Sequence, residues 1–155
     1  MRVSGPISKR RGFVLIAMSI TMLLLLACIG MAFDLGRVYI ARNEAQVFCD
    51  AASMAAASKI DGTEAGLDRA REAVARVPMK WSLGTKEFTG VEVEFSPDGV
   101  KWEKSPKDVA AAQFARVTAP SNQVEIVFLR AVGGPSSFTV PARAASATNP
   151  VRLVQ

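Results

Sequence analysis

The side chains that most often carry chemistry are scarce in this 155-residue sequence. It contains no histidine, which removes the commonest general base and the commonest zinc ligand. It also lacks a G-x-S-x-G turn, a phosphate-binding loop and a paired-cysteine motif. Asp98 and Asp108 lie in turn-forming stretches, and we expect them to be solvated turn residues rather than catalytic acids. The sequence therefore predicts no catalytic, metal-binding or cofactor-binding residues, and a protein that is not an enzyme.

The two cysteines, Cys28 and Cys49, are the remaining reactive side chains. If both lie on one helix, they are separated by about 31 Å at ~1.5 Å per residue, so no disulfide between them is expected. This distance does not exclude a disulfide between two chains. The segment Leu25-Leu26-Ala27-Cys28 is similar to the lipobox of bacterial lipoproteins, which makes Cys28 a candidate lipidation site.

A run of 21 residues without a charged side chain extends from Phe13 to Phe33. As a helix it would be about 31 Å long, close to the ~30 Å hydrocarbon core of a bilayer. Four basic residues precede it without an acidic partner: Arg2, Lys9, Arg10 and Arg11. Such a flank is typical of the cytoplasmic side of a membrane segment. We therefore expect a cytoplasmic tail over residues 1–12, one transmembrane helix over 13–33, and the remaining chain on the outer side.

Two cleaved forms are alternatives to this intact anchor. A secretory signal could be cut near Gly30-Met31-Ala32, but its apolar core should be only 7–15 residues long. A lipoprotein would be cut before Cys28, but the residues after Cys28 remain apolar for more than one turn, whereas a mature lipoprotein usually begins with a polar tether. The intact anchor fits the length of the run best.

The charge outside the N-terminal tail is nearly balanced. The net charge is +5, but only 15 of the 19 basic residues follow Gly12, against 14 acidic residues. No basic stripe interleaved with aromatic residues is visible, so the sequence does not indicate a nucleic-acid-binding protein.

The helical pattern continues beyond the apolar run to about residue 60, so we expect one helix from about residue 12 that ends before Gly62. Apolar or small residues recur at steps of three and four: Leu35, Val38, Ala45, Cys49, Ala52 and Ala56. With Ala41, the small residues form a stripe that lets another backbone approach closely. This stripe packs either on the sheet of the same chain or on other copies or partners.

The same helix carries a specific motif over about residues 9–60. After Gly12 and the apolar run, it consists of Asp34, Gly36, Arg37, Tyr39, Arg42, Gln46, Asp50, Ala51, Ala52 and Ala55. This pattern resembles the N-terminal module of TadE/TadG-like proteins of bacterial Flp pilus (tight-adherence) assembly. The resemblance departs at Phe48-Cys49, where the family typically has Ala or Asn before Asp-Ala-Ala.

The resemblance implies a membrane protein that acts in pilus assembly, secretion and adhesion at the cell envelope. Some proteins of this machinery are cut by a prepilin peptidase after a Gly, which makes Gly12–Phe13 a candidate cleavage site. The fifth residue after Gly12 is Ala17 rather than the Glu of such substrates. A membrane-retained accessory protein or minor pilin therefore fits better than a major pilin subunit.

Two acidic residues of the motif have alternative interpretations. Asp34 is expected either to end the apolar run and pair with Arg37 along the helix, or to contact a basic group of a partner. Asp50 lies in an alanine-rich stretch and, if buried, needs donors such as Arg116 or Arg143. On that basis Asp50→Ala is predicted to destabilise the domain.

The chain after Gly62 predicts a small α+β domain over residues 63–147. Thr63 can cap a helix over 64–77, and its apolar face would be Leu67, Ala70, Val74 and Val77. Alternation or β-rich composition predicts strands at 91–95, 100–103, 114–119, 124–130 and 138–147, the first two forming a hairpin and the last pushed to an edge or bulge by Pro141. Trp81 and Trp102 are expected in a core or interface, and residues 148–155 in a flexible tail.

The predicted fold is thus a long N-terminal helix, half in the membrane and half (residues 34–62) packed on an antiparallel sheet, as in pilins. The predicted function is that of a membrane-anchored accessory or minor-pilin protein of Flp pilus assembly. Its expected partners are the membrane and other pilus-assembly proteins or copies of itself, with no cofactor, nucleic acid or small-molecule substrate. We expect it in the bacterial inner membrane, with the C-terminal domain periplasmic. The alternative is a membrane-tethered module that binds an extracytoplasmic ligand.

Overall fold

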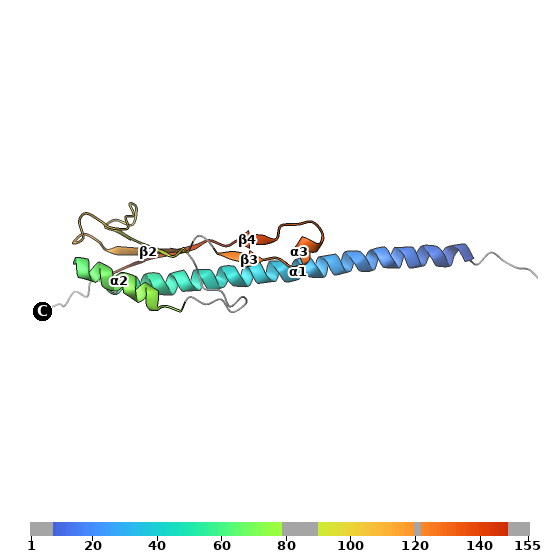
Figure 1. The fold of residues 1–155 in the computed structure, drawn as a ribbon, viewed down its shortest axis with the longest axis horizontal. Helices are drawn as coiled ribbons and strands as arrows, with labels where there is room; N and C mark the ends of the chain where they lie inside the picture. Colours follow the sequence, from blue (N-terminus) through green and yellow to red (C-terminus); the bar gives the residue numbers. More distant parts are fainter. Residues whose placement is uncertain (1–7, 79–89, 120–121, 149–155) are drawn as a thin grey trace, which may run out of the picture. The chain divides into compact units, whose positions relative to one another are not determined.

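The computed structural model describes residues 8–78, 90–119 and 122–148, with side chains from residue 12 onward (Figure 1). The chain forms two compact units: Met1–Gly36 with Ile126–Ser136, and Arg37–Glu125 with Ser137–Gln155. Arg2, Trp81 and the predicted tail from residue 149 lie outside the described residues.

Helix α1 (Ser8–Ala57) has 50 residues and contributes to both units. It contains no proline, and its glycines are few among strong helix formers. The helix predicted over residues 12–60 is confirmed, but it ends at Ala57. The chain then turns through short-range bonds, in which the amides of Lys59 and Ile60 donate to the carbonyls of Ala56 and Ala57.

The first unit pairs the N-terminal part of α1 with the one-turn helix α3 (Phe128–Ala131). The strand predicted over residues 124–130 is therefore wrong beyond Glu125. The reason is a long-range contact: the carboxylate of Asp34 accepts hydrogen bonds from the amides of Val127, Phe128 and Leu129. These amides point to one acceptor, as at the start of a helix, and are not available to a strand partner.

The second unit contains a three-stranded antiparallel sheet in the order β1-β2-β5. Its strands are β1 (Glu92–Ser96), β2 (Phe114–Ala119) and β5 (Ala142–Ala147). A second sheet pairs β3 (Gln123–Glu125) with β4 (Ser137–Thr139). The strand predicted over residues 138–147 is divided between the two sheets at Pro141, which has no N–H to donate to a ladder.

The predicted hairpin partner of β1 at residues 100–103 is reduced to a single bridge between Phe95 and Glu103. The side chain of Asp98 accepts hydrogen bonds from the amides of Val100 (2.9 Å) and Lys101 (3.0 Å). These local bonds hold the segment in a turn and withdraw its amides from strand pairing. The ladder neighbour of β1 is instead β2.

Helix α2 (Glu64–Arg76) begins as the sequence predicts. The hydroxyl of Thr63 accepts a hydrogen bond from the amide of Gly66 at 3.0 Å and caps the first turn. Leu67, Ala70 and Val74 are buried, and Val77 packs partly against the core. Its exposed side carries two ion pairs, Asp68–Arg71 and Glu72–Arg76.

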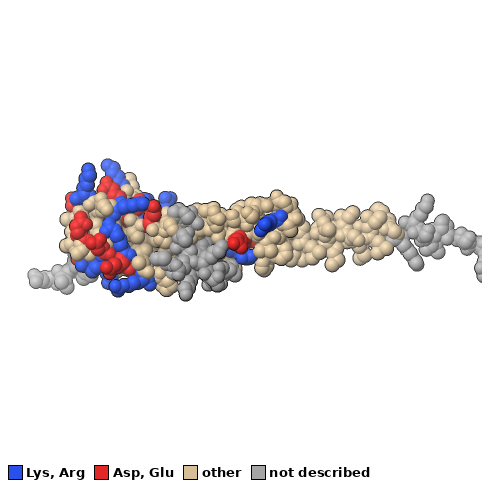
Figure 2. All heavy atoms as spheres, viewed as in Figure 1, with Lys and Arg blue, Asp and Glu red and all other residues tan. Residues whose placement is uncertain are grey.

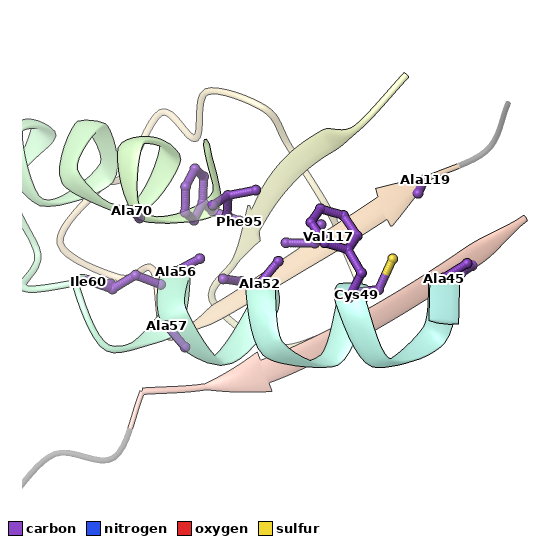
Figure 3. Close-up of a cluster of buried hydrophobic side chains, with 14 of the residues drawn as sticks. Ala45, Cys49, Ala52, Ala56, Ala57, Ile60, Ala70, Phe95, Val117 and Ala119 are labelled. Carbon is purple, nitrogen blue, oxygen red and sulfur yellow. The ribbon is translucent and has the colours of Figure 1, made fainter. Parts of the chain in front are cut away.

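The core of the second unit lies between α1 and the three-stranded sheet (Figure 3). The small stripe is fully buried there: Ala41, Ala45, Cys49, Ala52 and Ala56. Figure 3 shows Cys49, Ala52 and Ala56 of this stripe on the side of α1 that faces the sheet, near Phe95 and Val117. The interpretation that the stripe seats α1 on the sheet of the same chain is thus confirmed, and with it the predicted α+β fold. Leu35, predicted on the same face, is exposed instead.

Candidate functional site

The apolar run of α1 presents its side chains outward. Its most apolar 18-residue window has a mean hydropathy of 2.6, and none of that window is buried. The two most polar side chains form hydrogen bonds within the helix: Ser19 donates to the carbonyl of Leu15 and Thr21 to that of Ala17, both at 2.9 Å. Figure 2 shows this part of the chain without Lys, Arg, Asp or Glu. By length and composition, α1 can serve as a membrane anchor.

The candidate processing and lipidation residues lie on this same helix. Gly12 has no atom within 4 Å of the position a Cβ would take, and Phe13 is exposed. Cys28 is exposed on α1 and is not disulfide-bonded. Cleavage at Gly12–Phe13 and acylation of Cys28 both stay predictions.

Asp34 is the buried charged residue of the motif, with only 3% of its surface exposed. Its Oδ1 accepts from the amide of Val127 at 3.0 Å, and its Oδ2 accepts from the amides of Phe128 at 2.8 Å and Leu129. A carboxylate removed from water needs such donors. Asp34 is therefore the residue that ties α3 to α1, a role that the expected pairing with Arg37 did not include.

Two apolar contacts support this attachment. The rings of Phe33 and Phe128 meet edge to face, with centroids 5.4 Å apart. Gly30 faces Phe128 so closely that an added Cβ would lie 2.7 Å from the Cβ of Phe128. Gly30 is thus required by a close approach and marks the point where α3 packs on the apolar run.

Gln46 and Asp50 lie together on the solvent side of the second unit. The Nε2 of Gln46 donates to Oδ1 of Asp50 at 3.0 Å and to the carbonyl of Arg143 at 3.2 Å. Asp50 is exposed, so the burial considered for it is wrong. Its predicted donor Arg116 instead binds Glu94 through Nε and Nη2, at 2.9 and 2.7 Å.

Arg42 and Gln46 also line an open groove of about 430 Å³ beside β5. Its other lining residues are Thr118, Pro141, Ala142 and Arg143. The groove is shallow and exposed to solvent rather than enclosed, unlike most small-molecule sites.

The remaining motif residues divide between the core and the solvent face of α1. Ala52 is buried, Gly36, Arg37 and Ala55 are partly buried, and Tyr39 and Ala51 are exposed. Further apolar residues are exposed on this helix at steps of seven: Ile40, Val47 and Met54. Because seven residues are close to two helical turns, they lie on one face. The motif therefore combines positions that hold the fold with an apolar face open to solvent.

Cys49 and Asp98 are two of the groups in the second unit whose pKa is shifted. Burial raises the pKa of the Cys49 thiol to about 11. The amides of Val100 and Lys101 lower the pKa of Asp98, which fits a turn residue. Asp108 likewise accepts from a nearby amide, that of Ala111. Trp102 is partly buried and stacks under the guanidinium of Arg116, whose carbon lies 4.4 Å from the ring centroid.

No group of three His, Cys, Asp or Glu side chains within residues 12–78, 90–119 and 122–148 could hold a metal ion. These residues instead provide surfaces for contacts and an apolar helix that can act as an anchor.

The sequence did not predict the helical segment from Val127 to Val132. Its one signal was an apolar run without strict alternation, followed by Gly133-Gly134-Pro135.

The comparison with known families agrees with the motif. Residues 12–59 match the model of the Tad family, described as Flp pilus-assembly TadE/G-like. This match confirms the resemblance found in the sequence over these residues. No curated protein and no solved structure matches the chain.

Proposed function

We propose that this chain is a membrane-anchored accessory or minor-pilin protein of Flp pilus assembly, which acts by protein association and not by catalysis. The main support is that residues 12–59, matched by the pilus-assembly family, form one helix whose first part is an exposed apolar run. The second part of the same helix carries the sheet on its small-residue face. An anchor and a folded domain are thus joined by a single element.

The proposed arrangement places residues 1–12 in the cytoplasm, 13–33 in the bacterial inner membrane, and 34–62 with 63–147 on the outer side. The basic residues before the apolar run favour this orientation, because positive charge is retained in the cytoplasm. The ionised and paired side chains of the second unit suit an aqueous compartment.

Association uses the solvent face of α1 that bears Tyr39, Ile40, Val47 and Met54. Exposed apolar side chains repeated on one face of a helix are typical of a helix that packs against another. The partner is another pilus-assembly protein or a second copy of this chain. The open groove beside Arg42 gives only weak support to a ligand-binding module, since it encloses little.

A complementation experiment tests this function. The gene is deleted, restored as wild type or as Val47→Glu, and surface pili are counted by electron microscopy. We expect wild type to restore pili and Val47→Glu to reduce them strongly, with equal amounts of membrane-bound protein. Gln113→Glu, an exposed polar position before β2, is the control and should restore pili. Normal piliation in the deletion strain would contradict the proposal.

A further inference from the structure

We propose that the α3 tip, defined as residues 127–132, is a second membrane contact that inserts its apolar side chains at the outer lipid boundary and offers Arg130 to lipid phosphates. This inference rests on the proposed membrane anchor, because it uses the apolar run of α1 to fix the level of the bilayer. It adds a lipid-binding surface to a part of the chain that is distant in sequence from that run.

The level of the tip follows from its contacts with α1. Phe128 packs on Gly30 and Phe33, and both belong to the apolar run. Gly30 lies three residues before the end of that run, about 4.5 Å along the helix axis at ~1.5 Å per residue. The tip is therefore level with the last turn of the segment that occupies the hydrocarbon.

The tip exposes three large apolar side chains. Val127, Phe128 and Val132 are 51%, 48% and 66% exposed. Through Phe128, this apolar surface adjoins Phe33 on α1, which is itself exposed. An apolar patch joined to the surface of a membrane segment meets the same solvent as that segment, which is lipid.

Most amides of the tip donate within the unit, as a lipid boundary requires. Asp34 accepts three of its amide hydrogens. The amide of Val132 donates to Leu129 and that of Gly133 to Arg130. An irregular segment with these bonds can leave water without stranding the donors. The same three amides take the place of the water molecules that the Asp34 carboxylate would otherwise bind at this depth.

Arg130 supplies the polar part of the contact. It is exposed on the same turn as Phe128. A guanidinium on a long apolar stem can reach the phosphates of the headgroup layer while its neighbours enter the acyl boundary. The tip thus has the composition of a membrane-surface segment, with apolar anchors beside a cation.

Spin-label accessibility in the full chain tests this inference. The chain, with Cys28→Ser and Cys49→Ala, is placed in nanodiscs of phosphatidylethanolamine and phosphatidylglycerol. Single labels are attached at Val132→Cys, at Leu24→Cys in the apolar run, and at Val100→Cys, an exposed valine of the second unit. Collisions of each label with oxygen and with a water-soluble nickel chelate are measured.

We expect the oxygen-to-nickel collision ratio at residue 132 to be several-fold higher than at residue 100, and lower than at residue 24. A ratio at 132 equal to that at 100, with residue 24 in lipid, would overturn the inference and leave the anchor intact. An aqueous label at residue 24 would overturn the anchor and the inference together. Low collision with both reagents at 132 would mean that protein covers the tip, which also overturns it.

Two glycine variants give a matched control. Gly30→Ala places a methyl group against Phe128 and should move the tip, which raises nickel collisions at residue 132. Gly36→Ala adds the same methyl group on the same helix where nothing outside the local helix backbone lies within 4 Å, and should leave the nickel collisions unchanged. Equal behaviour of the two variants would contradict the depth assigned from the Gly30 contact.

Discussion

The carboxylate of Asp34 and the amide of Phe128 are hydrogen-bonded at 2.8 Å although 94 residues separate them in the sequence. Asp34 is buried, and the same carboxylate accepts from the amides on either side of Phe128. The aspartate that the motif places at the end of the apolar run is thus the attachment point of α3.

Replacing this carboxylate should release α3. Asp34→Ala leaves three amides without their acceptor, and we expect a local cost of about 3 kcal/mol. Hydrogen exchange of the amides of residues 127–129, measured on the chain in detergent micelles, should become faster by about a hundredfold. Asp68→Ala removes one exposed helical ion pair and should leave these amides unchanged. Unaltered exchange in Asp34→Ala would show that the three bonds contribute little.

Asp50→Ala should have a small effect, in contrast to the destabilisation predicted from sequence. Asp50 is exposed and receives a bond from Gln46, another exposed side chain. We expect a change in the free energy of unfolding of at most ~0.5 kcal/mol by urea titration. A loss of 2 kcal/mol or more (roughly the cost of an unpaired buried group) would restore the original interpretation.

The buried stripe should tolerate no increase in volume. Ala52 is fully buried between α1 and the sheet (Figure 3), so Ala52→Leu should destabilise the second unit by about 1–3 kcal/mol or more. The neighbouring Ala51 is exposed, and Ala51→Leu should be close to neutral. Both are followed by thermal unfolding of the chain in micelles. Equal losses in the two variants would argue against the packing of this face on the sheet.

Arg116 should not be replaceable by lysine. It binds Glu94 through two nitrogens and stacks on Trp102, and both side chains of the ion pair are largely shielded. Lysine has one charged nitrogen and no planar group, so Arg116→Lys should cost about 1 kcal/mol by urea titration. Arg76→Lys, in a solvent-exposed pair, is the control and should be neutral. A neutral Arg116→Lys would mean that charge alone suffices at this position.

Stability should fall at alkaline pH because of Cys49. Burial raises the pKa of this thiol to about 11, from an ordinary value of 9.0. The folded chain therefore keeps the proton where the unfolded chain loses it, and the contribution of Cys49 is complete below pH 9.0 and lost as the pH rises toward about 11. In a Cys28→Ser background, urea titrations compare Cys49 with Cys49→Ala across this range. The alanine variant should lose less stability, and parallel losses would contradict burial of the thiol.

Elements governed by local sequence were predictable. The long helix, the cap at Thr63 and the strand at 114–119 follow from helix formers, an N-cap residue and a β-rich run, and the structure confirms them. The packing of the small stripe on the sheet was one of two interpretations. Small side chains allow another backbone to approach closely, but they do not show which segment or chain that backbone belongs to.

Elements governed by distant contacts were not predictable from one sequence. Residues 127–131 have the composition of a strand. They begin a helical turn instead, because Asp34 accepts hydrogen bonds from the amides of residues 127–129. Residues 100–103 alternate like a strand, but Asp98 takes two of their amides. In the candidate site, the sequence places the motif residues along α1, whereas the burial of Asp34 and the exposure of Asp50 depend on which segments fold back onto α1.

The bond between Asp34 and α3 has a consequence for biosynthesis. A ribosome makes the chain from its N-terminus, so Asp34 is complete 93 to 95 residues before the three amides that it binds. During that interval the three amides that later donate to this carboxylate do not yet exist. Docking of α3 on α1 must therefore follow the synthesis of residues 127–129.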